Sequence, residues 1–339
     1  MVSGSGGLAR GWRALAVACV VLVLATPFPP VPVDGAEASP PPQSLDGPGG
    51  RTYAFAEVER ARVGEIPSGA SIFSPEGIPD VERSRMPVVL FLHGFGATDP
   101  TTYRGWITHL VRRGNTVIYP DYQPEGFLVL DQSAFVANML AGLKRGLDAA
   151  GLEPGEVHVV GHSLGAVIGA AYLASGSEAG LPPVASLTLV APGGCGTCGT
   201  MSGFGVPLPD RFEPPKGLLV NIVTGSDDTI VGDGDALAIW ARLADVPQGR
   251  KRLVEVQSDR YGSPELVADH LFPQSDGFGS EVDALDWYGV WRPLDSLIAC
   301  ASDGTFCEIA LGTDAAALEM GEWSDGGPVA PMVVDAGRP

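Results

Sequence analysis

The sequence predicts an α/β fold in which a mostly parallel central β-sheet is flanked by helices. Short apolar runs recur along the chain, as expected of strands that are buried on both faces of a sheet. Segments with a helical pattern lie between several of these runs. This alternation is typical of right-handed strand–helix–strand crossovers. No internal repeat of solenoid period is visible, so a repeat architecture is excluded.

The individual elements follow in order along the chain. An early antiparallel strand is expected at Tyr53–Val63, where apolar and polar residues roughly alternate. The buried strands are expected at Pro87–Leu92, Thr116–Tyr119, Val157–Val160, Ser186–Val190, Leu218–Val223 and Leu253–Val256. The helices between them are expected at Tyr103–Arg113, Gln132–Ala150, Leu164–Ala174 and Asp235–Leu243. Trp287, Tyr288 and Trp291 are expected in the core on the last helix.

The composition of the 339-residue chain excludes several classes of protein. Hydrophobic residues make up 45% of it and charged residues 18%, so the chain can form a sizeable core and is not disordered overall. Acidic residues number 40 against 21 Lys plus Arg, for a net charge of −19. That charge excludes the basic surface of a nucleic-acid-binding protein. No apolar run reaches the roughly 18 residues of a membrane-spanning helix, so no stable membrane insertion is expected.

The N-terminus has the pattern of an export signal. Arg10 and Arg13 precede the uncharged run Ala14–Ala25, and a small-x-small cleavage sequence follows at 36–38. Residues 1–38 are therefore predicted to be a signal peptide, and the protein to be secreted or on the exterior of the cell envelope. An uncleaved N-terminal anchor is the alternative.

The rest of the chain is expected to hold one domain. Residues 39–52 are rich in Pro and Gly and are interpreted as a linker, residues 53–325 as the catalytic domain, and residues 326–339 as a C-terminal tail. The stretch Pro192–Pro215 is rich in Gly and Pro without a helical pattern, which favours a small or absent lid over an open cleft.

The cysteines beyond the export signal are even in number, which favours disulfides in an exported chain. Proximity in the sequence favours the pairs Cys195–Cys198 and Cys300–Cys307. A zinc half-site or a redox pair at Cys195 and Cys198 is the alternative, but no second CxxC or HxxxH accompanies them.

The segment GHSLG at 161–165 matches the pattern G-x-S-x-G, in which a serine acts as nucleophile. The pattern alone is weak because this chain is rich in Gly. Its context strengthens it, since an expected strand precedes the segment and an expected helix follows it. A sharp turn between a strand and a helix lifts a serine hydroxyl out of the sheet. Ser163 is therefore the candidate nucleophile, and an ordinary capping serine is the alternative.

A serine hydroxyl needs a base and an orienting carboxylate. His270 is the candidate base because it is the histidine on a loop that follows the last expected strand. Asp228 is the preferred acid because it follows the expected strand Leu218–Val223, with its neighbour Asp227 as the alternative. Asp233 and Asp235 are expected to cap the next helix, although a calcium site made from the four aspartates is conceivable.

The oxyanion of a tetrahedral intermediate needs backbone amides aimed at it. The amide of Leu164, directly after the nucleophile, is one candidate. The amide of Phe95, in the Gly-flanked turn HGFG after the first buried strand, is the other. Aromatic residues that follow strands or lie near the base are candidates for an acyl pocket or for the core: Tyr122, Phe127 and Phe272.

These features together resemble the α/β-hydrolase superfamily. The segments that carry the resemblance are LFLHGFG, GHSLGA, TGSDDTIV and the ADH at 268–270. The likeness is strong from Pro87 to His270 and looser from Tyr53 to Ala310. It implies an oxyanion donor at Phe95, and it favours Asp228 over Asp227. The 42-residue interval between Asp228 and His270 is long for the family, but no other histidine follows Asp228.

The resemblance implies a secreted esterase, lipase or polyester hydrolase that cleaves carboxylic esters through an acyl-serine intermediate without a metal or cofactor. The expected substrate is a small-molecule or polymeric ester. Acyl transfer, thioester cleavage or amide cleavage on the same residues are alternatives. A non-catalytic binding protein on the same scaffold and a metal-dependent hydrolase are further alternatives, although the sequence offers no plausible cluster of metal ligands.

Overall fold

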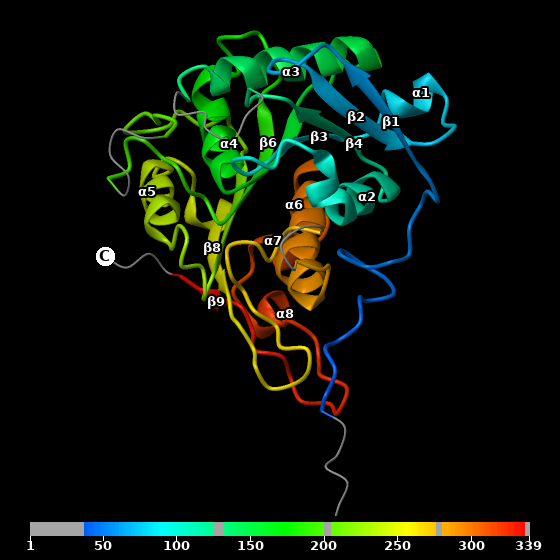
Figure 1. Ribbon diagram of the computed structural model, residues 1–339, viewed down its shortest axis with the longest axis vertical. Coiled ribbons are helices and arrows are strands. Elements are labelled where there is room, and N and C mark those ends of the chain that lie inside the picture. The colour runs from blue at the N-terminus through cyan, green and yellow to red at the C-terminus, as the bar shows by residue number, and fades with distance from the viewer. Residues whose placement is uncertain (1–36, 125–131, 200–204, 276–279, 336–339) are drawn as a thin grey trace, which may run out of the picture. The chain divides into compact units, whose positions relative to one another are not determined.

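A computed structural model describes residues 37–124, 132–199, 205–275 and 280–335 (Figure 1). The strands of this part of the chain form one nine-stranded sheet. They are β1 (Val58–Val63), β2 (Ala70–Pro75), β3 (Val88–Leu92), β4 (Thr116–Pro120), β5 (Val157–His162), β6 (Val184–Val190), β7 (Leu219–Gly225), β8 (Lys251–Val256) and β9 (Val333–Val334).

The strand order across the sheet is β1-β2-β4-β3-β5-β6-β7-β8-β9. The six strands from β4 to β8 in this order pair in parallel with one another. The two strands at one edge and β9 at the other pair antiparallel. The predicted fold class, a mostly parallel sheet flanked by helices, is confirmed.

Helices cover both faces of this sheet. In β3, Leu90 and Leu92 point into one core and Val89 and Phe91 into the other, because successive side chains of a strand face opposite sides. The first core packs against α3 (Phe135–Ala150), α4 (Leu164–Ser175) and α5 (Gly234–Arg242). The second packs against α2 (Arg104–Arg112), the π-helix Leu285–Trp291 and α6 (Arg292–Asp303). The remaining helices are short: α1 (Asp80–Arg83), α7 (Cys307–Leu311), α8 (Ala315–Leu318) and the 3-10 turns Pro100–Tyr103 and Gln248–Arg250.

The first two strands of the sheet differ from the sequence prediction. The first strand begins at Val58 rather than at Tyr53. The strand β2 was not predicted, because two serines interrupt its sequence, ASIFSP, which therefore lacks an apolar run. All six of its residues are nevertheless buried, since β2 lies between β1 and β4.

The two segments expected to flank residues 53–325 contact that part of the chain. In the expected linker, the amide of Gly49 donates a hydrogen bond to Asp295 Oδ2 at 2.8 Å. In the expected tail, Val329 and Met332 are buried and β9 pairs with β8. Residues 326–335 therefore extend the sheet and its core, a role that their polar, Gly-rich start does not indicate.

Both disulfides favoured by sequence proximity are present. Cys195 and Cys198 lie 5.4 Å apart between their Cα atoms, and Cys300 and Cys307 lie 4.8 Å apart. Tyr288 is buried as expected. The described residues contain no helix that is both long and apolar enough to cross a membrane. The predicted signal peptide, apart from its last two residues, lies outside the described residues.

Candidate active site

Ser163 lies on a sharp turn between β5 and α4. Its backbone has φ 56° and ψ −123°, a conformation that a non-glycine residue adopts only when its surroundings enforce it. The two glycines of the turn are required by close approach. A Cβ on Gly161 would lie 2.4 Å from the carbonyl oxygen of Gly165, and one on Gly165 would lie 2.2 Å from that of Leu92. The local sequence therefore forms the strained turn that the G-x-S-x-G pattern predicts.

The structure brings the three candidate side chains together. The hydroxyl oxygen of Ser163 lies 2.9 Å from His270 Nε2, and His270 Nδ1 lies 2.8 Å from Asp228 Oδ2. All three side chains are buried. They come from the carboxyl end of β5, the turn after β7 and the loop after β8. All three places lie at the carboxyl ends of parallel strands. This arrangement has the geometry of a nucleophile, a base and an orienting acid.

Asp228 rather than Asp227 is the carboxylate that contacts His270. The other carboxylate oxygen of Asp228 accepts hydrogen bonds from the amides of Ile230 and Val231, each at 3.0 Å. Burial raises the pKa of Asp228, but the hydrogen bonds from His270 and the two amides outweigh it and hold the pKa below its ordinary value. Asp227 instead forms an ion pair with Arg260 at the surface.

The conceivable calcium site is not formed by these aspartates. Asp228 is bound to His270, and Asp235 accepts a hydrogen bond from the amide of Cys195 at 2.9 Å. Within the described ranges, the one group of three side chains spaced to hold a metal is Cys195, Cys198 and Asp235. Its two cysteines are joined in a disulfide, so their sulfurs are not thiolate ligands.

The two candidate oxyanion donors are Phe95, after β3, and Leu164, at the start of α4. Phe95 follows β3, where the amides of its neighbours are engaged. The amide of Gly94 donates to Tyr103 Oη at 2.9 Å, and that of Gly96 donates to Gln123 Oε1 at 2.8 Å. The amide of Phe95 has no acceptor among the described residues. Leu164 is the first residue of α4, where a backbone amide has no partner within the helix.

Sequence analysis missed two polar residues of the site, Tyr103 and His162. His162 lies within the GHSLG segment but is buried behind it, where Nδ1 lies 2.8 Å from Tyr103 Oη and Nε2 lies 2.9 Å from the carbonyl oxygen of His270. Tyr103 is fully buried at the end of the turn Pro100–Tyr103. No local pattern indicates these contacts, because they join residues 59 and 108 positions apart.

The loop after β6 covers part of the elbow. The amide of Gly193 donates to the carbonyl oxygen of Ser163 at 3.3 Å. The disulfide Cys195–Cys198 follows, and Arg242 of α5 donates to the carbonyl oxygen of Thr197 at 2.7 Å. Residues 192–199 and 205–215 of this connection contain no helix.

The aromatic residues that were candidates for an acyl pocket or for the core lie in different parts of the molecule. Tyr122 belongs to the core, because its ring stacks on His93 at 4.0 Å and its hydroxyl donates to the carbonyl oxygen of His93. Phe272 lines a cavity of about 220 Å³ beside the His270 loop, together with the carboxylates Asp269, Glu281 and Asp283. Phe127 lies outside the described residues.

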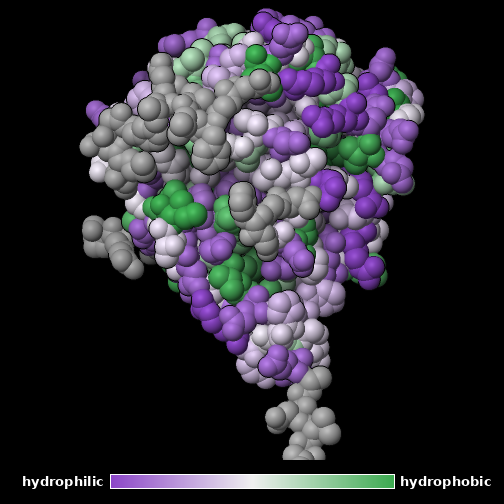
Figure 2. Space-filling view, viewed as in Figure 1, coloured by the Kyte–Doolittle hydropathy of each residue, from purple (hydrophilic) through white to green (hydrophobic). Residues whose placement is uncertain are grey.

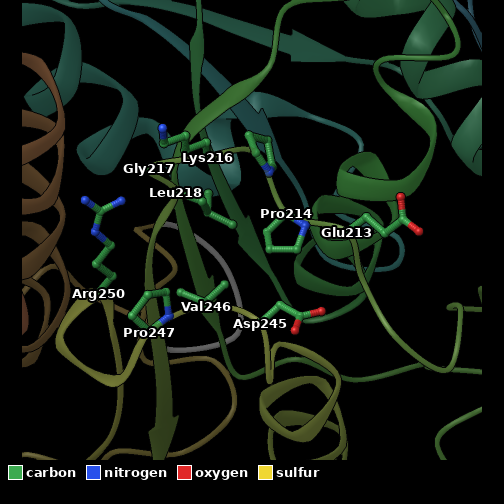
Figure 3. A pocket seen from close by; sticks show the side chains of 10 residues that line it. Glu213, Pro214, Lys216, Gly217, Leu218, Asp245, Val246, Pro247 and Arg250 are labelled. Carbon is green, nitrogen blue, oxygen red and sulfur yellow. The ribbon is translucent and has the colours of Figure 1, made fainter.

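Another cavity lies away from the candidate active site. Its volume is about 420 Å³, and Lys216 and Arg250 line one side of it while Glu213 and Asp245 line the other (Figure 3). It borders Leu218, directly before β7, whereas Asp228 follows that strand. The cavity therefore lies at the amino-terminal end of β7, whereas the triad lies at the carboxyl ends of the strands. No residue of the triad lines this cavity.

The family model described as "Alpha/beta hydrolase family" matches residues 89–334. No curated protein sequence matches the chain. Among solved structures, an esterase from the fungus Rhizomucor miehei is similar, with 17% identity and a TM-score of 0.49 over 73% of this chain and 86% of that one. Carboxyl esterase 2 from the fungus Tuber melanosporum is also similar, with 17% identity and a TM-score of 0.48 over 79% of this chain and 91% of that one.

A hormone-sensitive lipase from a metagenome library is similar at 20% identity, with a TM-score of 0.43 over 60% of this chain and 78% of that one. The matching family model spans most of the chain, from within β3 to β9. The sheet order and the elbow between β5 and α4 agree with that match. On this basis, the chain belongs to the alpha/beta hydrolase family.

Proposed function

We propose that the protein is an exported serine hydrolase that cleaves carboxylic esters through an acyl-serine intermediate. The observation that carries this proposal is the hydrogen-bonded series from Ser163 through His270 to Asp228 at the strained elbow. A binding protein on the same scaffold needs none of these contacts. The strained backbone of Ser163 further supports a functional role, because such strain persists where the site requires it.

In the first half of the reaction, His270 Nε2 takes the proton of Ser163 as the serine oxygen attacks the ester carbonyl carbon. The C=O electron pair moves onto the oxygen, and the amides of Phe95 and Leu164 stabilise the resulting oxyanion. Removing one such donor raises the barrier by about 3–4 kcal/mol in enzymes of this type. Asp228 stabilises the imidazolium. The imidazolium then protonates the leaving alcohol as the bond from the acyl carbon to the alkoxy oxygen breaks.

In the second half, His270 accepts a proton from water, whose oxygen attacks the acyl carbon of the acyl-serine. The second tetrahedral intermediate collapses, the carboxylic acid leaves and Ser163 regains its proton from His270. Every proton in this cycle moves between the substrate, water, Ser163 and His270. Because a water molecule is the acceptor here, an alcohol or amine in its place would give acyl transfer on the same residues.

The substrate is proposed to be an uncharged ester, either a small molecule or a polymer. The net charge of −19 disfavours polyanionic substrates. Carboxylates line the cavity beside the His270 loop, and burial raises the pKa of one of them, Asp283, to about 6. On the face of the molecule seen in Figure 2, apolar side chains lie in small separate groups among polar ones.

Export is proposed from residues 1–38, and the two disulfides support it because such bonds persist in oxidising compartments. Sequencing the N-terminus of the protein recovered from the culture medium or envelope fraction tests this. A mature chain that begins at or near Ser39 is expected. A chain that retains its first residues would indicate an anchor instead.

The test of the reaction is a chain-length series of p-nitrophenyl esters, measured on the mature protein beside Ser163→Ala. Activity is expected to fall by at least about 10³-fold in the variant, because only the oxyanion donors and binding remain. A fluorophosphonate probe should label the wild-type protein at Ser163 and leave the variant unlabelled, since only an activated serine reacts.

Ser186→Ala is the matched control. Ser186 is also buried in the sheet, and its hydroxyl lies 2.8 Å from the Nδ1 of a buried histidine, His158. It lacks an elbow and a carboxylate partner on that histidine among the described residues, so normal activity and labelling are expected. Near-normal hydrolysis by Ser163→Ala would refute the proposed nucleophile. Labelling of the wild type without ester turnover would favour acyl transfer or amide cleavage.

A further inference from the structure

A buried tyrosine hydroxyl joins the loop after β3 to the elbow. The hydroxyl oxygen of Tyr103 lies 2.9 Å from the amide of Gly94 and 2.8 Å from Nδ1 of His162. The amide can only donate, so the hydroxyl accepts there and donates its own proton to His162. Nδ1 of His162 therefore carries no proton.

His162 continues this connection to the loop of the base. Its Nε2 lies 2.9 Å from the carbonyl oxygen of His270, which only accepts, so Nε2 carries the proton of the ring. Burial, and then the proximity of His270, lowers the pKa of His162 to about 3. The ring is thus neutral near pH 7 and adds no positive charge beside the imidazolium that His270 forms during the reaction.

Three hydrogen bonds therefore run in one direction, from Gly94 to Tyr103, from Tyr103 to His162 and from His162 to the backbone of His270. The first residue of this series precedes Phe95, and the last carries the base. The elbow lies in the middle, because His162 directly precedes Ser163. The series is buried, so water does not compete for its members.

We propose that Tyr103 and His162 are positioning residues. They hold the loop after β3, which carries the candidate oxyanion donor Phe95, and the base His270 in register with Ser163. This inference rests on the proposed function. Neither residue reacts: Tyr103 acts through Gly94, and His162 acts through the carbonyl group of His270. Holding that carbonyl limits how far the imidazole can move away from the serine hydroxyl. Displacing a reacting group by about 1 Å lowers the rate by about 100-fold.

The test is Tyr103→Phe, which removes one oxygen and keeps the ring that packs against Phe91 at 5.1 Å. The expected result is a fall of about 10- to 100-fold in kcat for a p-nitrophenyl ester, with KM within about twofold of the wild-type value. Labelling of Ser163 by the fluorophosphonate should slow by a similar factor yet still reach one label per chain.

Tyr172→Phe is the control. Tyr172 is also a buried tyrosine, and its hydroxyl donates to the carbonyl oxygen of Pro182 at 2.8 Å, away from the elbow. Tyr103→Phe loses two buried hydrogen bonds and Tyr172→Phe loses one that is partly buried, so Tm is expected to fall in both variants and further in Tyr103→Phe, whereas kcat should fall only in Tyr103→Phe. A merely structural role would lower Tm without separating the kcat values of the two variants.

A second pair of variants decides the matter if Tyr103→Phe does not fold. His162→Gln keeps a side-chain N–H donor for the carbonyl group of His270, and His162→Leu has none. The expected order of kcat is wild type, then His162→Gln, then His162→Leu. Equal kcat values in the two variants would overturn the inference.

Failure of this inference is distinguishable from failure of the proposed function. Wild-type protein that neither hydrolyses esters nor reacts with the probe would overturn both. Wild-type protein that does both, beside a Tyr103→Phe variant with unchanged kcat and labelling rate, would overturn the positioning role alone. A raised KM at unchanged kcat would also overturn it, because it indicates lost binding rather than lost alignment.

Discussion

Gly165 and Leu92 are in backbone contact: a Cβ on Gly165 would lie 2.2 Å from the carbonyl oxygen of Leu92. Leu92 is the last residue of β3, directly before the loop that carries Phe95, and Gly165 is the second residue of α4. This contact sets how closely the helix after the nucleophile approaches the neighbouring strand. Of the two candidate oxyanion amides, that of Leu164 directly precedes Gly165 in the sequence, and that of Phe95 follows Leu92 by three residues.

Replacing Gly165 with Ala should therefore damage both stability and activity. The new methyl group would overlap backbone atoms that no side-chain rotation can move, so α4 must shift away from β3. We expect a loss of about 3 kcal/mol or more in the free energy of unfolding, or no folded protein. Urea denaturation and the yield of fluorophosphonate-labelled protein measure the two effects. Gly155→Ala is the control, because nothing lies within 4 Å of a Cβ there, and a comparable loss in both variants would contradict the argument.

Asp228 and Asp227 should differ sharply when each is changed to Asn. In the proposed mechanism the carboxylate of Asp228 orients His270 and stabilises its charged form, so Asp228→Asn should lower kcat by about 10³- to 10⁴-fold. Asp227→Asn removes only an exposed ion pair with Arg260, a type of contact that contributes about 0–1 kcal/mol to stability. Steady-state kinetics on the same ester measures the difference. Equal losses in both variants would mean that the base is oriented by another group.

The buried histidines should contribute progressively less to stability as the pH decreases from about 6.5 to about 4. Burial lowers the pKa of His93 and of His158 to about 4, below the value of about 6.5 for an unfolded histidine. Within this window the two histidines bind protons in the unfolded chain but not in the folded chain, so their contribution to the free energy of unfolding decreases as the pH falls, whereas Asp283, whose pKa burial raises to about 6, contributes in the opposite direction. Urea denaturation at pH 7 and at pH 4.5 measures it.

His158→Asn tests the origin of this pH dependence. His158 lies at the start of β5, and its ring contacts Ser186 rather than any residue of the candidate triad. The variant removes one of the titrating groups, so the difference in unfolding free energy between pH 7 and pH 4.5 should become smaller than in the wild type. An unchanged difference would assign the pH dependence to other groups.

The parts of the fold that were predicted from the sequence depend on local patterns. The apolar runs that became β3 to β8 indicate strands because burial on both faces demands apolar residues throughout. The elbow is equally local, since strand, turn and helix follow one another within a few residues. The strand β2 escaped prediction because Ser71 and Ser74 interrupt its apolar residues, and only the neighbouring β1 and β4 make it part of the sheet.

The sequence by itself therefore determined the fold class, the family resemblance and the residue types offered to the candidate site. Only the tertiary structure decided which of those residues meet. The order of β5, β6, β7 and β8 in the sheet brings Ser163, Asp228 and His270 together at the carboxyl ends of these strands. The same packing places Tyr103 against His162. The physical reason is that hydrogen bonds between residues 42 to 107 positions apart depend on which strands are neighbours, and no periodicity within a single segment carries that information.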